Sequence, residues 1–376
     1  MGTDNPVLRL LWLLCFLYYV GASHFRGGLI TWAPVYNQPK QITVTWRLSW
    51  NRASVACDQT TIDTNALIGS GSICEIGPNN CFGAQTYCND FNVVDNWSSG
   101  TFVTTFTATS TSFVLQYFGN AWISLSNGGG NWDLRSHVNL TPRPVGRPIN
   151  TSPTTSISPV VIAPPGTTNT IHIPTIDADG DHIRCRWATG ESGGVTQPLT
   201  SVLSLDPLTC TITFTSSGII WGVALYIEDF LTSDSTTPLS TVPLQFLIQV
   251  KALPAGCTTT TATLIAPAPA HGSQIVIDAE VLYTAEIHGK PASGTEPIIQ
   301  IATISPRGMI RSTVMSGNGN NKYVTINWTP ELSQGGPNIF CFSVSDRCQS
   351  SHQWCVTLMV QLTCDPECVN GGVCAE

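Results

Sequence analysis

Three aspartates that alternate around a glycine are the residues best suited to chemistry in this chain. They are Asp177, Asp179 and Asp181, with Gly180 before the last. A hard cation such as Ca²⁺ binds several oxygens at about 2.3–2.6 Å, and a tight turn brings three carboxylates toward one point. The spacing does not fit an EF-hand, whose glycine is the sixth loop residue and whose bidentate glutamate is the twelfth. Two interpretations stay open: a calcium site, or a solvated turn of the kind that aspartate side chains stabilise.

Catalytic chemistry has little support elsewhere in the chain. The histidines are scattered singly without HExxH spacing, and the cysteines form no CxxC pair of the kind that binds zinc. The glycine run 128–130 lacks the lysine and the following helix of a phosphate-binding loop. We therefore predict that the protein is not an enzyme and that it has no cofactor, unless the aspartate turn binds calcium.

Tryptophans crowd the N-terminal third of the chain and raise a carbohydrate-binding alternative. The six residues are Trp32, Trp46, Trp50, Trp97, Trp122 and Trp132. Exposed tryptophan rings can stack on sugars, whereas rings in strands usually fill the core. Trp132 follows three glycines and is expected to be the most exposed of them. A secreted, lectin-like protein is therefore the alternative function.

The first 22 residues have the pattern of a signal peptide. Arg9 supplies a positive flank, residues 10–20 are apolar, and Val20-Gly21-Ala22 offers small residues for cleavage. Eleven apolar residues are too few to span a bilayer, which takes about 20 as a helix. Only 11% of residues are charged and basic runs are absent, so nucleic acid is not an expected partner. We expect a secreted or cell-surface protein, anchored in a membrane only if further sequence supplies a span.

The cysteines agree with export, because disulfides persist in oxidising compartments. Cys185 and Cys210 are the only pair in the middle of the chain and should bond. Cys341 and Cys355 lie on strands that flank a turn, so they could pair, and Cys257 would then take Cys348. The pairing among four earlier cysteines stays open: Cys57, Cys74, Cys81 and Cys88. Four sequons are possible N-glycan acceptors, at Asn96, Asn139, Asn150 and Asn327.

Short alternating runs between Gly and Pro residues predict an all-β chain. Residues 41–50 place Ile42, Val44, Trp46 and Leu48 on one face. Further strands are expected at residues 101–106, 112–117, 121–125 and 218–227.

Two later segments repeat one order of features. In each, a strand precedes a glycine turn, a second strand ends in aspartate, and a third strand closes the unit. The strands lie at residues 211–214, 223–229 and 243–250, and again at 324–328, 340–346 and 354–360. This order resembles the last strands of immunoglobulin-like and cadherin-like sandwich domains. The cadherin-like pattern implies that Glu228 and Asp229 could add carboxylates to the aspartate turn, although the cadherin interdomain calcium motif is absent.

The last residues resemble the opening of an EGF-like module. The run from Cys364 through Cys368 to Cys374 contains the Asn-Gly-Gly turn of that family. The resemblance implies a bond between Cys364 and Cys374, which leaves Cys368 without a partner and suggests a truncated module.

The start of the mature chain also carries a resemblance. Residues 23–28 (SHFRGG), 30–34 and 42–48 are similar to the opening of large, uncharacterised secreted proteins. In that family a β-domain precedes sandwich repeats and EGF-like modules, and the likeness implies architecture and location but no chemistry.

Together these features predict a tandem all-β organisation. We expect a signal peptide (1–22), a β-rich N-terminal domain (23–147), two sandwiches (148–252 and 253–363) and the start of an EGF-like module (364–376). The function we predict is extracellular adhesion, matrix or receptor-ectodomain binding, with proteins or glycans as partners. The identity of the ligand and the oligomeric state do not follow from the sequence.

Overall fold

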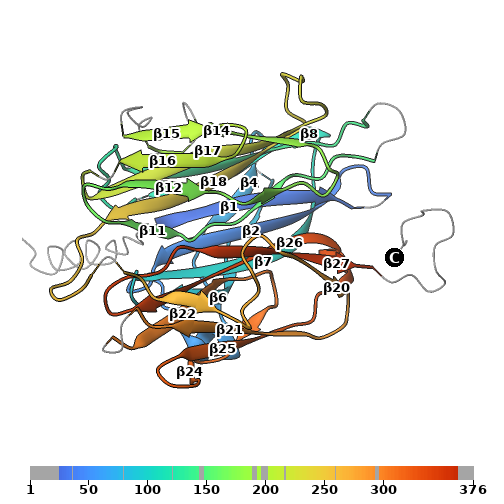
Figure 1. Cartoon of the computed structure of the whole chain (residues 1–376). Coiled ribbons are helices and arrows are strands. Elements are labelled where there is room, and N and C mark those ends of the chain that lie inside the picture. The colour runs from blue at the N-terminus through green and yellow to red at the C-terminus, as the bar shows by residue number, and fades with distance from the viewer. Residues whose placement is uncertain are drawn as a thin grey trace, which may run out of the picture.

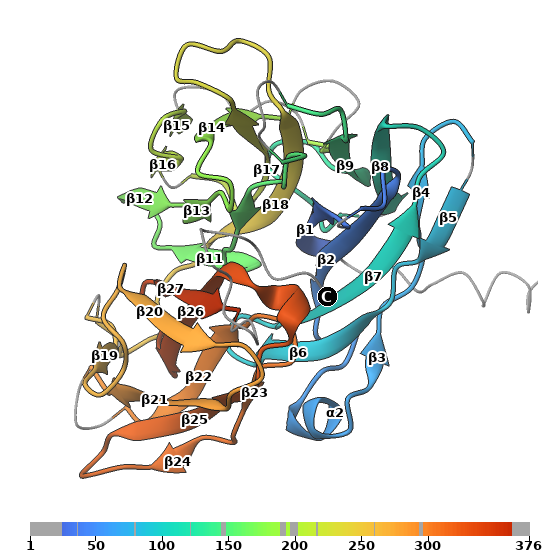
Figure 2. The same cartoon turned by 90° about the vertical axis from the view of Figure 1, so that its right-hand side faces the viewer.

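The computed structural model describes residues 25–362, apart from 36, 79, 121, 144–147, 189–192, 196–201, 216, 259 and 293–295. The chain is almost entirely β-structure, in three groups of strands (Figures 1 and 2). We refer to these groups as the first, second and third units. They follow the order of the expected domains, whose exact bounds stay a prediction.

The first unit has nine strands and one short helix. They are β1 (Phe25–Pro34), β2 (Gln41–Asn51), α2 (Gln59–Asp63), β3 (Leu67–Ile68), β4 (Ser72–Glu75), β5 (Asn80–Gly83), β6 (Thr86–Asn92), β7 (Trp97–Thr107), β8 (Ser112–Asn120) and β9 (Asn131–Asn139). Alternate residues of β2 are buried, from Ile42 to Leu48, as its pattern predicts. The strand expected at 121–125 is wrong, because Trp122 and Leu125 make only isolated bridges.

The second unit is a sandwich. Its strands are β10 (Thr154–Thr155), β11 (Val160–Ala163), β12 (Thr168–His172), β13 (Thr175–Ile176), β14 (His182–Trp187), β15 (Leu203–Asp206), β16 (Thr211–Thr215), β17 (Ile220–Phe230) and β18 (Ser240–Val250). β11, β18, β17 and β14 form one layer, and β12, β16 and β15 form the other. Every residue of β17 is buried, which explains its uninterrupted apolar run.

The third unit repeats this plan. Its elements are β19 (Thr263–Ile265), β20 (Gln274–Asp278), β21 (Tyr283–Lys290), β22 (Ile298–Ile304), β23 (Ile310–Arg311), β24 (Met315–Ser316), β25 (Lys322–Trp328), η1 (Leu332–Gln334), β26 (Gly336–Asp346) and β27 (Trp354–Gln361). In both units an early strand pairs in parallel with the last one: β11 with β18, and β20 with β27. The structure therefore confirms tandem β-sandwiches.

β18 joins the first two units into one sheet. β17 pairs with β18 along almost its whole length. Since a strand has only two edges, β9, β1 and β11 must share the other edge, where they pair at Thr241, at Leu244 and Gln245, and at residues 247–250. Gly27 makes this approach possible: its φ is +127°, and a Cβ there would lie 1.9 Å from the carbonyl oxygen of Gln245.

A buried polar contact docks the third unit onto the first. Asp90, on β6, accepts hydrogen bonds from the Thr303 hydroxyl (2.6 Å), the Ser305 hydroxyl (2.8 Å) and the Ser305 N–H (3.1 Å). Nearby, the Gln300 side chain accepts from the Val93 N–H at 2.8 Å. These hydrogen bonds supply a fully buried carboxylate of the first unit with donors from the third unit, so they help to hold the two units together.

Five disulfides lie within the described residues. They are Cys57–Cys88, Cys74–Cys81, Cys185–Cys210, Cys257–Cys348 and Cys341–Cys355. The last three are the pairs that the sequence favoured, and the first two give one of the three connectivities left open. Residues 364–376, with the expected Cys364–Cys374 bond, lie outside the described residues.

Candidate functional site

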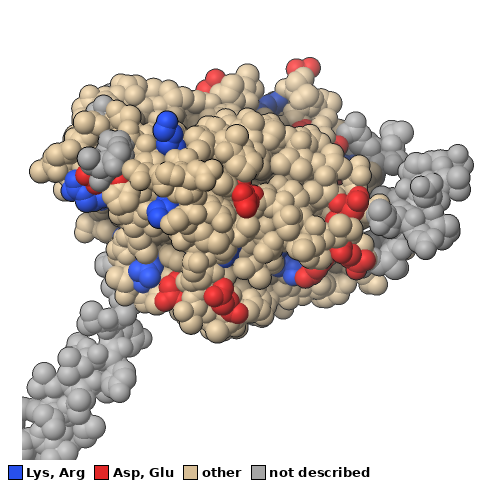
Figure 3. Space-filling view, turned by 60° about the horizontal axis from the view of Figure 1, so that its bottom comes forward, with Lys and Arg blue, Asp and Glu red and all other residues tan. Residues whose placement is uncertain are grey.

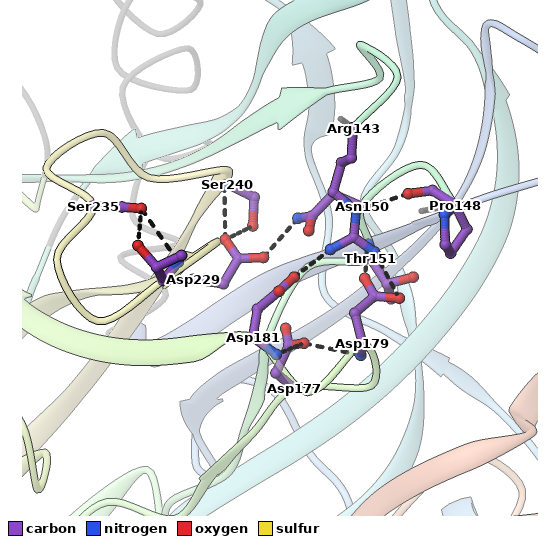
Figure 4. Close-up of polar contacts among 11 residues, drawn as sticks. Arg143, Pro148, Asn150, Thr151, Asp177, Asp179, Asp181, Asp229, Ser235 and Ser240 are labelled. Atoms are coloured by element: carbon purple, nitrogen blue, oxygen red, sulfur yellow. Dashed lines mark hydrogen bonds and ion pairs between the residues drawn. The ribbon is translucent and has the colours of Figure 1, made fainter. Parts of the chain in front are cut away.

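The aspartate turn connects β13 to β14 and is a hydrogen-bonded loop (Figure 4). One oxygen of Asp177 accepts from the N–H groups of Asp179 (2.9 Å) and Asp181 (3.0 Å). Gly180 has φ +74°, a conformation that glycine adopts without strain. One carboxylate oxygen from each of the three aspartates lies within 4.8 Å of the other two, so the turn does bring them together.

A guanidinium lies among these carboxylates. Arg143 forms an ion pair with Asp181, lies 3.3 Å from Asp179 Oδ1, and donates from Nε to the Pro148 carbonyl at 2.7 Å (Figure 4). The Arg143 side chain is 3% exposed and that of Asp181 is 1% exposed. Sequence reasoning missed this arginine, because it lies in a proline-rich segment with the composition of a linker.

Asp229, at the end of β17, adds a fourth carboxylate. Its Oδ2 accepts from Asn150 Nδ2 at 2.6 Å, and its Oδ1 accepts from the N–H and the hydroxyl of Ser240, each at 2.7 Å. Glu228 was also expected here. Because successive strand residues point to opposite faces, it instead pairs with Arg186 at 2.9 Å.

Burial sets the electrostatics of the turn. It raises the pKa of Asp177 to about 7, and it also raises the pKa values of Asp179 and Asp229. Asp177 Oδ2 is buried and has no hydrogen-bond partner. Arg143 pairs with two of the four carboxylates, Asp179 and Asp181, so ionisation of Asp177 or Asp229 would add negative charge that this guanidinium does not pair.

The donor chemistry fits a hard cation, since the groups that the turn brings together are carboxylate oxygens. Arg143 nevertheless holds Asp179 and Asp181 already, which leaves Asp177 as the carboxylate able to bind an ion without displacing the arginine. The arrangement can therefore do two things: fix the segment around Arg143 to the second unit, and attract a cation to Asp177.

The burial of the tryptophans corrects the expectation that Trp132 is exposed. All six of the N-terminal tryptophans are buried, and Trp132, expected to be exposed, is only 4% exposed. Its ring stacks on Phe25 (centroids 4.8 Å apart) and meets Trp50 edge-on. A Cβ on Gly119, which pairs with Trp132, would lie 2.5 Å from this ring, so a glycine makes room for it. None of these rings offers a face to a sugar, and the lectin-like alternative loses the residues on which it rested.

The sequons differ in accessibility. Asn96 and Asn327 are exposed, and Asn139 is half-buried. Asn150 is 2% exposed, and its Nδ2, the atom that would carry a glycan, donates to Asp229. A glycan at Asn150 would have to break this bond, so the exposed positions are the better acceptors.

One Gly-x-Ser-x-Gly pattern is present, at residues 190–194, and is an exception to the general lack of catalytic motifs. A nucleophile elbow requires a strand before the serine and a helix after it. β14 ends at Trp187, but the next element among the described residues is the strand β15. Ser192 itself lies outside the described residues. Within the described residues, the helix that an elbow requires after the serine is not found.

A cleft of about 330 Å³ lies where the three units meet. We call it the junction cleft. One wall contains Val160, Val161 and Ile162 of β11 and residues 169–172 of β12; the other contains residues 349–353 of the third unit, with Asp95 of the first. Because successive strand residues face opposite sides, a wall made of consecutive residues must be a strand edge. β11 pairs only with β18 and β12 only with β16 within the described residues, so both edges are open.

The surface elsewhere carries few charges. In the view of Figure 3, most of the surface is uncharged, and several of the few acidic side chains lie near one another on the right of the molecule. Burial raises the pKa of Asp95 in the junction cleft, where it accepts a hydrogen bond from Ser350.

Within the described residues, no helix has the length and apolarity needed to cross a membrane.

Solved structures with similar strands include adhesion and enzyme domains. The extracellular domain of protocadherin gamma B4 is 14% identical and covers 78% of this chain and 43% of its own, with a TM-score of 0.21. Dpr2 Ig1–Ig2 in complex with DIP-Theta is 5% identical over 88% of this chain and 99% of its own (TM-score 0.21). An endo-fucoidan hydrolase of glycoside hydrolase family 107 is 14% identical and covers 79% of this chain and 39% of its own, with a TM-score of 0.22. At these scores the likeness carries no conclusion about function.

The sequence comparisons concern one group of proteins. Residues 26–141 match the family model "Integrin beta-like protein A-E, N-terminal". Integrin beta-like protein C of Dictyostelium discoideum is 22% identical over 416 residues, which cover 98% of this chain and 20% of the relative. The chain thus spans about a fifth of that relative's length. The chain is therefore similar to the integrin beta-like proteins, in its first unit by the family model and over almost its whole length by this relative.

Proposed function

We propose that this chain is the N-terminal part of a non-enzymatic, extracellular adhesion-type protein that binds a protein partner. The observation that carries the proposal is the similarity to an integrin beta-like protein over 98% of the chain. The disulfides and the charge-poor β-surface support an extracellular location.

The adhesion proposal is tested by cell attachment. The mature chain, residues 23–376, is secreted from a host cell and coated on beads beside a reduced and alkylated sample of the same chain. The native beads should attach to cells of the source organism, and the reduced beads should not, because folding depends on the disulfides. Equal attachment of both samples would contradict a specific adhesive function.

The junction cleft is the surface that we propose for the partner, with an extended peptide segment as the occupant. An extended peptide can pair with an open strand edge through main-chain hydrogen bonds, while pockets between the strands select its side chains. The edges of β11 and β12 offer such a surface: β11 contributes aliphatic residues such as Ile162, and β12 contributes polar ones such as His172.

A matched pair of substitutions tests the cleft. Thr170 lines the cleft, and its partner across the strands, Thr213, is equally exposed but does not line it. Peptides selected from a displayed random library on the native chain should bind the Thr170→Arg variant at least about tenfold more weakly, and the Thr213→Arg variant unchanged. Equal loss in both variants would place the peptide site elsewhere.

The aspartate turn supports a second proposal, calcium binding. The supporting observation is the unpartnered, buried Asp177 Oδ2 within 4.8 Å of carboxylate oxygens of Asp179 and Asp181. Calorimetry of the mature chain should show heat of binding at millimolar calcium, which Asp177→Asn abolishes. Arg143→Met should strengthen binding, because it removes the positive charge that pairs with Asp179 and Asp181. No heat at millimolar calcium in either the native chain or Arg143→Met would refute the proposal.

A further inference from the structure

The turn between β24 and β25 carries an asparagine directly followed by a glycine. Asn318 and Gly319 are both exposed, and the Asn321 N–H donates to the Asn318 carbonyl at 3.3 Å to close the turn. The same pair of residue types occurs at 127–128 and at 370–371, of which the latter lies outside the described residues. The turn and residues 127–128 therefore allow one reactive sequence to be compared in two surroundings.

An asparagine before a glycine can react with its own main chain. The nitrogen of Gly319 attacks Cγ of Asn318, a bond forms between these atoms, and the Cγ–Nδ2 bond breaks. Ammonia leaves with the proton of the attacking nitrogen, and a five-membered succinimide ring remains. Water then opens the ring at one of its two carbonyls and gives either aspartate or isoaspartate, in which the main chain runs through Cβ and Cγ. Glycine favours the attack because it has no Cβ to hinder the approach.

Both reacting groups are free at the β24–β25 turn. Among the residues that the structure describes, none forms a hydrogen bond with the Asn318 side-chain amide or with the Gly319 N–H. β24 pairs with β25 only at Met315 and Ser316, so little structure restrains the turn. The ring can therefore close here without any opening of the fold.

The same pair is held in place at Asn127, which is 7% exposed. Its Nδ2 donates to the Gly222 carbonyl at 2.8 Å, and its Oδ1 accepts from the Gly222 N–H at 2.9 Å. Ring closure expels Nδ2 and turns the side chain toward its own main chain, so both hydrogen bonds must break first. A site that reacts only after local opening is slowed by the free energy of that opening.

We propose that Asn318 is a site of spontaneous deamidation, at which the protein acquires a mixture of aspartate and isoaspartate as it ages. Both products add a negative charge to the turn, and isoaspartate also adds a carbon to the main chain. Asn318 does not line the junction cleft, so the inference is independent of the partner site proposed there.

Mass spectrometry of the ageing chain tests the proposal. The mature chain is kept at mildly alkaline pH, where more of the attacking nitrogen is deprotonated, and the deamidated fraction at each asparagine is followed in its proteolytic peptides. The comparison samples are the Asn318→Gln variant, the native chain reduced and unfolded in urea, and a synthetic peptide of residues 312–322. Glutamine would need a six-membered ring, which closes more slowly. Electron-transfer fragmentation separates isoaspartate from aspartate.

In the folded chain Asn318 should react at nearly the rate of the peptide and at least about tenfold faster than Asn127. Unfolding should raise the rate at Asn127 to that at Asn318, because both asparagines precede glycine. Equal rates at the two positions in the folded chain would overturn the proposal. So would a mass gain in residues 312–322 that Asn318→Gln leaves unchanged, or a product without isoaspartate, because the succinimide at Asn318 would then not be the route.

Discussion

Arg143 and Asp181, which are 38 residues apart in the sequence, form an ion pair that is almost completely buried. The arginine comes from the segment that joins the first and second units, and the aspartate from the loop before β14. This pair ties the joining segment to the second unit.

Loss of the arginine should be costly. Arg143→Met would leave Asp179 and Asp181 buried without their counter-charge, and breaking a buried pair from one side typically costs about 3–5 kcal/mol. Urea unfolding should show a lower midpoint with an unchanged slope. Arg347→Met, which removes an exposed pair with Glu296, is the control and should change little. Equal effects would mean that the buried pair has no special role.

The stability of the fold should depend on pH through Asp177. Burial raises its pKa to about 7 in the folded chain, whereas an unfolded aspartate titrates near about 3.9. The folded state therefore binds more protons in this interval, and the contribution of Asp177 to stability is lost as the pH rises from about 4 to about 7.

Asp177→Asn removes this pH-dependent loss of stability. It keeps a side-chain oxygen that can accept hydrogen bonds from the N–H groups of Asp179 and Asp181. In calcium-free buffer we expect the variant to be about 1–2 kcal/mol more stable than the native chain at pH 8, after allowing for solvent screening, and equal to it near pH 3.5. Urea titrations at the two pH values measure the difference. If the variant and the native chain differ in stability by the same amount at both pH values, ionisation of Asp177 is not the cause of the difference.

Gly27 should tolerate no side chain. In Gly27→Ala the new Cβ would overlap the Gln245 carbonyl, so β1 would have to move away from β18, at a cost of about 2–4 kcal/mol. Gly130→Ala is the matched control: its φ is also positive, at +106°, but no atom lies within 4 Å of its Cβ. Thermal unfolding should separate the two variants. If they lose equal stability, backbone strain rather than the approach of β18 is responsible.

The docking of the third unit should depend on Asp90. In Asp90→Asn the charged acceptor becomes a neutral amide, so the hydroxyls of Thr303 and Ser305 must reverse and accept from its NH₂ group; the charge-assisted bonds are lost, at about 1.5–3 kcal/mol. Denaturant unfolding measures the loss. Asp206→Asn, in an exposed turn, is the control and should change stability much less. A native midpoint for Asp90→Asn would show that the contact adds nothing to stability.

Local patterns in the sequence predicted the strands well. The alternation from Ile42 to Leu48 and the apolar run of β17 lie in strands because side-chain period and burial are local properties. The order of features in the two repeats is likewise local, and it corresponds to two sandwiches of the same plan.

Contacts between distant residues could not be read in the same way. Nothing near Arg143 in the sequence signals the aspartates that bind it, and nothing in Gly27 signals Gln245. Trp132 follows a glycine run that is typical of an exposed loop, yet the strand pairing places its ring over Gly119 and against Phe25. Each of these outcomes depends on the tertiary fold, which overrides local preference.

The shared strand β18 also bears on the order of events during synthesis. β1 emerges near the start of the chain, but the residues that pair with Gly28 and Leu29 are Gln245 and Leu244. A newly made first unit must therefore keep this edge open until two units have been translated, and such non-local pairing slows folding. Chaperones that cover the waiting edge of β1 would be needed most in that interval, and a chain cut before residue 240 would expose it permanently.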